Sequence, residues 1–184
     1  MSQHLTIDEL ERALDTIRES PKDGGPLELI VRRPNVGARE ELREADLHPV
    51  EGLVGDSWIA RSSTRTTDGS PHPHMQLNVM NSRVIALLAQ DRSRWQLAGD
   101  QLFVDLDLSS ENLPPWTKLA LGSAVIEITD QPHTGCNKFI ARFGVDAARF
   151  VNSTTGKALR LRGLNARVLE PGRIRVGDVA TKIG

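Results

Sequence analysis

The strongest constraint on the fold is a series of short β-type segments that are separated by Gly and Pro turns. Each segment carries alternating or β-branched apolar residues, as half-buried strands do. The expected strands are 27–31, 75–80, 102–108, 124–128, 163–169 and 173–179. Helical patterns fall between some of them, at 83–90 and 145–151. This order predicts a mainly β protein, a β-barrel-like or curled sheet, with a few decorating helices.

Two segments stand apart from this pattern. Charged residues dominate 40–45, which we expect to be a brief helical or irregular solvated stretch. Near the N-terminus, Thr6 and Glu9 form a capping box that predicts a helix over about 7–19. We interpret 1–25 as a helical addition to a single domain of all 184 residues. A helix that is integral to the core fits the same pattern equally well.

The composition excludes several classes of protein. The formal net charge is −1, whereas a general nucleic-acid-binding protein has a basic excess. No apolar run reaches the roughly 20 residues that span a bilayer. We expect no secretory leader, because the basic, apolar and small-residue pattern of one is not seen. We therefore expect neither a nucleic-acid nor a membrane partner. The single cysteine cannot form an internal disulfide, which favours a cytoplasmic location.

Cys136 is the residue with the most chemical content. It follows the expected strand 124–128 and a turn that contains Pro and Gly, and 138–143 can open a helix. The positive N-terminal end of such a helix would favour the thiolate, as would Lys138 and Arg142. A thiolate can act as a nucleophile or as a soft metal ligand. A lone cysteine is also often a buried small apolar residue, and the local sequence allows that interpretation.

Two further features are candidates for function. The stretch 61–73 is polar and has little expected order, and long loops of this kind are often functional or mobile. His72 and His74 on an extended segment would share one face, as a metal-binding pair does. An ordinary entry from loop to strand explains the two histidines as well. Gly52 and Gly55 bracket a tight turn, and Asp56, directly after it, is expected to hold this turn by bonding local backbone.

From residue 51 onward, the order of short motifs resembles that of a known family. The motifs are Gly52-Leu53-Val54-Gly55-Asp56, Gly99-Asp100, Glu111-Asn112-Leu113, Leu121-Gly122, Gln131-Pro132-His133-Thr134-Gly135-Cys136-Asn137-Lys138-Phe139, Arg162-Gly163 and Pro171-Gly172-Arg173-Ile174-Arg175-Val176-Gly177-Asp178. In this order they are similar to the MOSC domain, named for the C-terminal part of molybdenum cofactor sulfurase, a parent family that also binds pyridoxal phosphate. The resemblance covers roughly 27–184. This chain has Gly135 where many relatives have Pro, and 68–74 replaces their Lys-x-His-Gly-Gly sequence.

The resemblance implies a β-barrel-like fold in which Cys136 faces a pocket for the molybdenum–pterin cofactor (molybdopterin). In characterised relatives such a cysteine is either a direct molybdenum ligand or a sulfur carrier. The resemblance also implies that Asn112 bonds the pterin or an oxo ligand of the metal. Lys138 and Arg142 are candidates for the pterin phosphate by charge, and a solvated face explains them equally well. Arg65, in the loop that replaces the relatives' motif, is a further cofactor-binding candidate.

Three functions remain open from the sequence. The first is an oxidoreductase that holds the molybdenum cofactor through Cys136 and reduces N-hydroxylated small-molecule substrates. The chain has no Gly-x-Gly-x-x-Gly motif and no cysteine set for an iron–sulfur cluster, so this function needs a separate electron-donor protein. The second is a sulfur carrier or transferase that uses a Cys136 persulfide. The third is a non-catalytic binding module with the MOSC fold.

Overall fold

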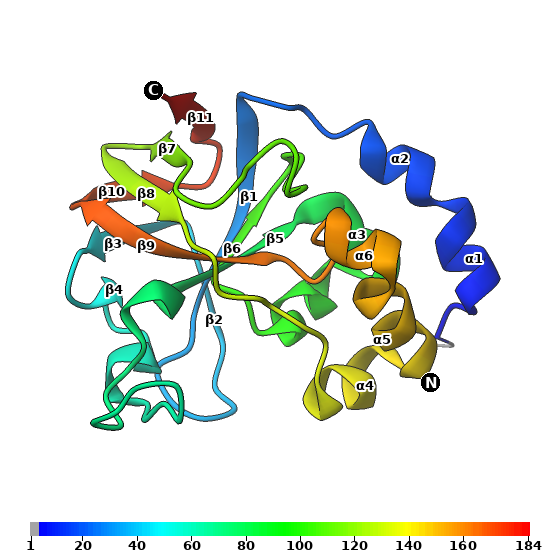
Figure 1. The fold of residues 1–184 in the computed structure, drawn as a ribbon, viewed down its shortest axis with the longest axis horizontal. Coiled ribbons are helices and arrows are strands. Elements are labelled where there is room, and N and C mark those ends of the chain that lie inside the picture. Colours follow the sequence, from blue (N-terminus) through cyan, green and yellow to red (C-terminus); the bar gives the residue numbers. More distant parts are fainter. Residues whose placement is uncertain (1–3) are drawn as a thin grey trace.

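A closed β-barrel forms the centre of the protein in the computed structural model, which describes residues 4–184 (Figure 1). The ring runs β11-β7-β8-β9-β5-β6-β1 and returns to β11. Its strands are β1 (Gly25–Arg32), β5 (Leu77–Asn81), β6 (Leu102–Val104), β7 (Lys118–Leu121), β8 (Ala124–Ile128), β9 (Leu164–Glu170) and β11 (Val179–Ile183). All neighbours pair antiparallel except β5 and β6. The predicted barrel-like, mainly β fold with decorating helices is confirmed.

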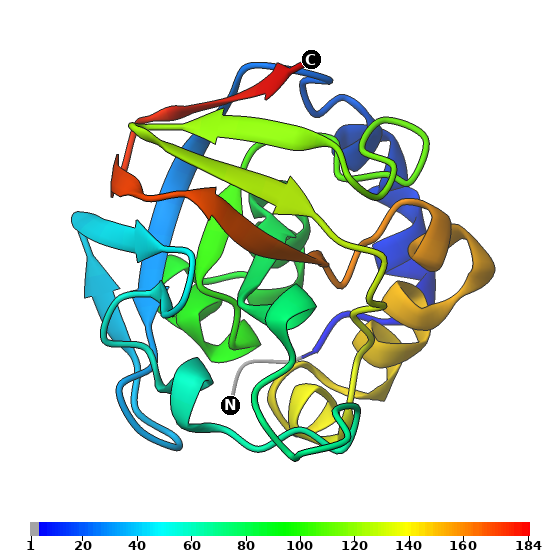
Figure 2. The same cartoon turned by 60° about the vertical axis from the view of Figure 1, so that its left-hand side comes forward.

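The ring closes where β1 meets β11. Gly25 pairs with Ala180 and Pro26 pairs with Val179. On its other side, β11 pairs with β7, and Figure 2 shows these two strands side by side. A side chain at position 25 would collide with the carbonyl oxygen of Asp105, so only glycine lets the backbones approach this closely.

Several barrel strands are buried on both faces. In β1, Leu27 and Ile30 point into the barrel, whereas Leu29 and Val31 face the helices. The pairing of β1 with β6 shifts register between Leu27 and Leu29, and this irregularity lets residues three positions apart share the interior face. Phe103 of β6 also faces the helices. Burial on both sides explains why these segments are nearly continuous apolar runs.

A second, three-stranded sheet lies beside the barrel, in the order β10-β3-β4. Its strands are β3 (Glu44–His48), β4 (Gly52–Leu53) and β10 (Gly172–Arg175), and the short β2 (Glu40–Leu42) extends the barrel from β1. The prediction of a helical or irregular segment at 40–45 was therefore wrong. These strands carry exposed charged side chains, and Glu44 and Asp46 of β3 bind Arg173 across the sheet. The expected strand 173–179 is divided, because β10 ends at Arg175.

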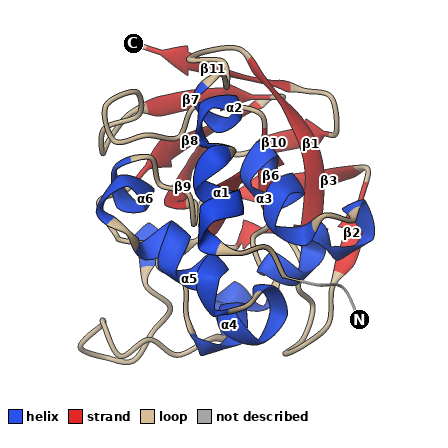
Figure 3. Ribbon diagram, turned by 90° about the vertical axis from the view of Figure 1, so that its right-hand side faces the viewer, coloured by secondary structure: helices blue, strands red, loops and turns tan. Residues whose placement is uncertain are grey.

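The helices cover one side of the barrel, as Figure 3 shows. They are α1 (Ile7–Arg12), α2 (Leu14–Arg18), α3 (Ser82–Ala89), α4 (Asn137–Phe143), α5 (Val145–Asn152) and α6 (Thr154–Ala158), with 3-10 helices η1 (Ser57–Ala60), η2 (Pro73–Met75) and η3 (Arg92–Ala98). Their apolar faces form a second core against the outside of β1, β5 and β6. None of the helices in the described chain has the length and apolar character that crossing a bilayer requires.

The N-terminal segment is a broken helix that packs on α5. The Thr6–Glu9 capping box is present, as predicted, but the helix is interrupted at Ala13. Leu10 and Ile17 are buried in the helical core. The backbone N–H of Ile7 donates to the carboxylate of an α5 aspartate, Asp146 (3.2 Å). These contacts tie the predicted 1–25 addition to the same core as α3 and α5, over the residues of it that the structure describes.

Candidate functional site

Cys136 lies at the end of a loop that joins the barrel to the helical layer. The loop leaves β8 after Ile128 and has no regular structure until α4 begins at Asn137, with Cys136 as its N-terminal cap. The predicted order of strand, turn and helix around the cysteine is therefore confirmed. Cys136 is exposed, so the alternative of a sealed apolar residue does not apply.

The surroundings of Cys136 favour its thiolate. Partial burial raises the pKa of the thiol, but the backbone N–H groups of Phe139 and Lys138 and the charge of Arg162 lower it by more. The net effect is a pKa below the ordinary value of a cysteine. The first N–H groups of a helix have no partners inside the helix, and a thiolate at the cap position takes that role. Reactive cysteines occupy environments of this kind.

Two asparagine side chains hold the cysteine loop in place. The amide of Asn152, at the end of α5, accepts from the N–H of Gly135 (2.9 Å) and donates to its C=O (3.1 Å). The amide of Asn165, in β9, donates to the carbonyl oxygens of Gln131 (3.1 Å) and Pro132 (3.3 Å). An irregular loop needs such partners for its buried backbone groups. The position of Cys136 is therefore fixed from both the helical layer and the barrel.

Three arginines of the site donate hydrogen bonds to the chain at 97–100, at the end of η3. Arg142 of α4 donates to the C=O of Leu97 (2.6 Å), and Arg33 donates to the C=O of Gly99 (2.9 Å). Arg162 donates to the C=O of Ala98 (3.0 Å). The carbonyl groups at the end of a helix attract cations. This segment thereby brings together arginines from the chain just after β1, from α4 and from the turn before β9.

Asp100, His133 and Arg162 form a buried group next to the cysteine loop. Arg162 is paired with Asp100 at 2.7 Å, and Nδ1 of His133 lies 3.5 Å from the other carboxylate oxygen of Asp100. Burial, followed by the charge of Arg162, lowers the pKa of His133 to about 3, although Asp100 acts in the opposite direction. His133 is therefore neutral at physiological pH. Its Nδ1, Asp100 Oδ1 and Arg162 Nε are buried without a hydrogen-bond partner.

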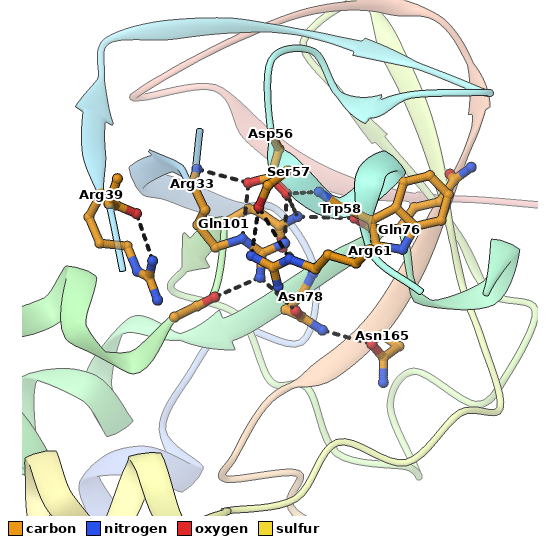
Figure 4. Close-up of polar contacts among 12 residues, drawn as sticks. Arg33, Arg39, Asp56, Ser57, Trp58, Arg61, Gln76, Asn78, Gln101 and Asn165 are labelled. Carbon is orange, nitrogen blue, oxygen red and sulfur yellow. Dashed lines mark hydrogen bonds and ion pairs between the residues drawn. The ribbon is translucent and has the colours of Figure 1, made fainter. Parts of the chain in front are cut away.

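An arginine cluster also lies at the 97–100 segment, and Figure 4 shows three of its members, Arg33, Arg39 and Arg61. The fourth member is Arg142. Guanidinium nitrogens of Arg39 and Arg142 lie 3.6 and 3.8 Å from the position that a Cβ of Gly99 would occupy. Among residues 4–184, the only carboxylate paired with a member of this cluster is that of Asp56, which binds Arg33. The cluster thus has an excess of positive charge.

The excess of positive charge affects the pKa values of Arg39 and Arg61. Burial, followed by the charges of Arg142, Arg33 and Arg61, lowers the pKa of Arg39. Burial, followed by the charge of Arg33, lowers the pKa of Arg61. The partners of the two side chains are neutral: Arg39 donates to the C=O of the preceding residue, and Arg61 donates to the hydroxyl of Ser57. The Nε of Arg39 is buried without a partner. An anion would satisfy all of these groups at once.

The structure places three predicted site residues around the cysteine loop or the arginine cluster. Arg142 belongs to the cluster, at the opposite end of α4 from Cys136. Lys138 contributes its backbone N–H to the thiolate, and its side chain is exposed. Arg65 reaches across from its exposed loop to the side chain of Gln131, at 3.4 Å, in the cysteine loop. The roles of these residues toward a cofactor stay predictions.

Asn112 lies elsewhere in the fold. Its amide nitrogen donates to the carbonyl oxygens of Lys22 (2.9 Å) and Asp107 (2.8 Å), and its oxygen accepts from Lys182 (3.0 Å). These contacts join the chain before β1 to the loop after β6 and to β11, and none of them involves the cysteine loop. The predicted contact with a pterin stays untested, and the amide already has partners for its donor and acceptor groups.

His72 and His74 contact each other and residues near them in the fold. The ring centroids of His72 and His74 are 5.6 Å apart, and Nδ1 of His72 accepts from the N–H of His74. His74 lies 3.8 Å from a carboxylate oxygen of Asp130 and contacts the ring of Trp116 edge-on. Across residues 4–184, no group of three His, Cys, Asp or Glu side chains is arranged to hold a metal ion. The structure therefore gives no support for a metal site at this pair.

Asp56 has the predicted local role and a larger one. It accepts from the N–H of Trp58 and so caps η1, as expected of a turn residue. It also binds the buried guanidinium of Arg33 at 2.8 and 2.9 Å. Burial raises the pKa of Asp56, but the hydrogen bonds and charge of Arg33 lower it by more, so the carboxylate stays ionised. Sequence reasoning missed Arg33 and Arg39, because their relation to Arg142 is visible only after folding.

A cavity of about 390 Å³ adjoins the cysteine loop. One wall is the loop itself, residues 129–134, and the opposite wall comes from the end of α5, α6 and the start of β9. Arg162 and His133 line it, and the charge of Arg162 also lowers the pKa of Cys136. Cys136 itself is not among the lining residues.

Comparison with known proteins identifies the class to which this barrel and cysteine loop belong. The model of the MOSC domain matches residues 72–181, and the chain therefore belongs to the MOSC domain family. The matched region contains the cysteine loop, the 97–100 segment and Arg162. The predicted family is thereby confirmed. A comparison with curated proteins gave no match.

Solved structures with the same fold include the YuaD protein from Bacillus subtilis, at 15% identity and a TM-score of 0.61, covering 85% of this chain and 96% of that one. YiiM from Escherichia coli is 18% identical with a TM-score of 0.56, covering 86% of this chain and 70% of that one. YiiM from Geobacillus stearothermophilus is 12% identical with a TM-score of 0.53, covering 88% and 74%. At these identities the likeness concerns the fold.

Proposed function

We propose that this MOSC protein binds the molybdenum cofactor through Cys136 and reduces N-hydroxylated small molecules with electrons from a separate donor protein. The observation that carries the proposal is the exposed cysteine at the start of α4, whose thiol pKa is lowered. A thiolate is a ligand that suits a soft metal. The family to which the chain belongs is associated with this cofactor, and the reaction is the part that experiment must decide.

The residues around the 97–100 segment fit an anionic group such as the cofactor phosphate. Arg39, Arg61 and Arg142 would hold it, because they have neutral oxygen partners and carry uncompensated charge. The unpartnered Nε of Arg39 is a donor that such a group could satisfy. Cys136 would supply the metal ligand. Arg33 is already neutralised by Asp56 and would shape the site instead of binding the anion.

When bound, the cofactor supplies two-electron chemistry that side chains cannot perform. In the proposed reaction the N–O bond of the substrate is broken and the nitrogen is reduced. Two electrons come from the donor protein, and two protons from solvent complete the amine and the water that leaves. The described residues hold the cysteine loop rigid through Asn152 and Asn165, and they keep His133 neutral beside it.

Metal analysis of protein produced in a molybdenum-replete host tests the proposal. We expect about one molybdenum per wild-type chain, and a loss in Cys136→Ala and in the double variant Arg39→Gln/Arg61→Gln. Arg149→Gln, at an exposed position of α5, is the matched control for a lost charge and should retain the metal. Loaded protein should reduce benzamidoxime with reduced methyl viologen as the donor. Absence of molybdenum from the wild-type protein would contradict cofactor binding.

A sulfur carrier is the second candidate, and the exposure of Cys136 favours it as well. A persulfide on Cys136 would be held by the same N–H groups of Lys138 and Phe139 that favour the thiolate. Mass spectrometry of the intact chain separates the two functions. A reducible sulfur adduct confined to Cys136, in protein without molybdenum, would identify a carrier. Neither metal nor adduct would leave the non-catalytic binding module as the function.

A further inference from the structure

The cavity beside the cysteine loop has a charge that the proposed reaction does not explain. Its lining includes Lys157, Arg160 and Arg162, with Asp130 as the carboxylate on the opposite wall. Arg162 is neutralised by Asp100. Among residues 4–184, neither Lys157 nor Arg160 forms an ion pair, and with the one carboxylate of Asp130 the lining keeps a net charge of +1. The interior of a cavity focuses such charge because its walls have a low dielectric.

The two cations without an ion pair differ in what they can do. The guanidinium of Arg160 donates to the carbonyl oxygens of Leu108 (3.4 Å) and Leu113 (2.6 Å), and it holds two parts of the chain together. Burial lowers the pKa of Arg160. Lys157 is exposed on α6, and its ammonium group has no partner among the described residues. Lys157 is therefore the cation that a ligand can reach.

The size and position of the cavity indicate a small organic ligand. A volume of about 390 Å³ lies at the lower end of the range for small-molecule sites. Threonine and glutamine side chains of residues 129–134 supply polar groups on one wall, and Val151 and Leu164 supply apolar surface. The loop that forms this wall leads directly to Cys136. A molecule in the cavity therefore lies next to the cysteine loop.

We propose that this cavity binds the substrate, and that the substrate is an N-hydroxylated compound of one or two rings that carries a carboxylate facing Lys157. The inference rests on the proposed function for the reaction, but the binding it describes is measured independently of molybdenum content. An ammonium group at the mouth of a cavity binds a carboxylate as a partly solvated ion pair. Lys157 is a specificity residue: it holds the carboxylate at the cavity mouth and takes no part in breaking the N–O bond.

Two ligands that differ by one carboxylate group test the inference. Benzamidoxime is neutral, and 4-carboxybenzamidoxime has the same ring with a carboxylate opposite the reacting group. Calorimetric titration of the wild-type protein should give a dissociation constant about fivefold lower for the carboxylate form, as one partly exposed ion pair provides. Lys157→Gln should reduce that preference to less than twofold. Lys118→Gln, exposed on β7, is the matched control and should keep it.

The outcomes separate this inference from the proposed function. Equal affinity for the two ligands, no binding of either, or an unchanged preference in Lys157→Gln would overturn the inference. If the loaded protein reduces benzamidoxime without any preference for the carboxylate form, the reaction stands and the cavity assignment fails. The protein could instead prefer the carboxylate form, lose this preference in Lys157→Gln, and reduce neither compound. The cavity would then stand as a binding site, and the proposed reaction would be wrong.

Discussion

The side-chain amide of Asn152 is hydrogen-bonded to both the N–H and the C=O of Gly135, at 2.9 and 3.1 Å. Gly135 directly precedes Cys136, so this one amide sets the position of the peptide that carries the thiol. It also links the end of α5 to the start of α4, two helices that are neighbours in the layer over the barrel.

Replacing Asn152 by Ala should loosen the cysteine without removing it. Each hydrogen bond contributes about 1 kcal/mol, so we expect the free energy of unfolding to fall by about 1–2 kcal/mol. The thiol should also react more slowly with iodoacetamide at pH 7, because the N–H groups that favour the thiolate are no longer held against it. Urea denaturation and the labelling rate measure the two effects. Asn35→Ala, at an exposed loop position, should change neither. An unchanged labelling rate in Asn152→Ala would contradict the positioning role.

The thiol of Cys136 should titrate at a lower pH in the folded protein than in the unfolded chain. An unperturbed cysteine has a pKa of about 8.5, and the N–H groups of Lys138 and Phe139, with the charge of Arg162, lower it here despite burial. The rate of alkylation follows the thiolate fraction, so its midpoint should lie below that of the same chain in urea. Cys136 is the only cysteine, and Cys136→Ser provides the blank. A midpoint equal to or above the midpoint measured in urea would contradict the lowered pKa.

Loss of the Asp56 carboxylate should be among the most costly single changes in the protein. In Asp56→Asn the guanidinium of Arg33 keeps its buried position and loses its counter-charge, a loss of about 3–5 kcal/mol. Because the folded-state pKa of Asp56 is lowered, its contribution is full above the unfolded pKa and is lost as pH falls through the folded value. Denaturation by urea at pH 7 measures the loss. The double variant Arg33→Met/Asp56→Leu should be more stable than Asp56→Asn, and the opposite order would refute this account.

His133 should make the folded protein less stable in mild acid. Its pKa is about 3 in the folded state and about 6.5 in the unfolded chain, so the unfolded state binds the extra proton between these values. Stability is unaffected above pH 6.5 and falls as pH drops below it, by about 2 kcal/mol at pH 5. Measuring the free energy of unfolding at pH 7.5 and pH 5 gives the slope. His133→Asn should lack this part of the slope, and identical slopes in both proteins would show that His133 does not titrate in this way.

Local signals in the sequence were enough to find the elements around the cysteine. The strand 124–128 coincides with β8, and the helix after Cys136 is α4. Both are set by neighbours in the chain, through alternation of apolar residues and a helix start beside a Gly and a Pro. The capping box of Thr6 and Glu9 is equally local. The order of short motifs also identified the family.

The rest of the site depends on contacts between distant segments. Arg33 and Arg39 lie between β1 and β2, and Arg142 lies in α4. They meet only because the 97–100 segment supplies the carbonyl groups that bind Arg33 and Arg142. Each arginine alone is typical of a solvated surface. The error at 40–45 has a related cause, since β2 and the start of β3 gain their order from distant partners such as Arg173, while their own residues are mostly charged.

The seam between β1 and β11 joins Gly25 and Pro26 to Val179 and Ala180. A nascent chain that emerges from the ribosome therefore cannot complete its ring until residues 179–183 have left the exit tunnel. Up to that moment β1 and β7 each present an unpaired edge, and such edges invite pairing with another chain. The cysteine loop and its arginines precede β11 in the chain, so they are synthesised before that seam can close.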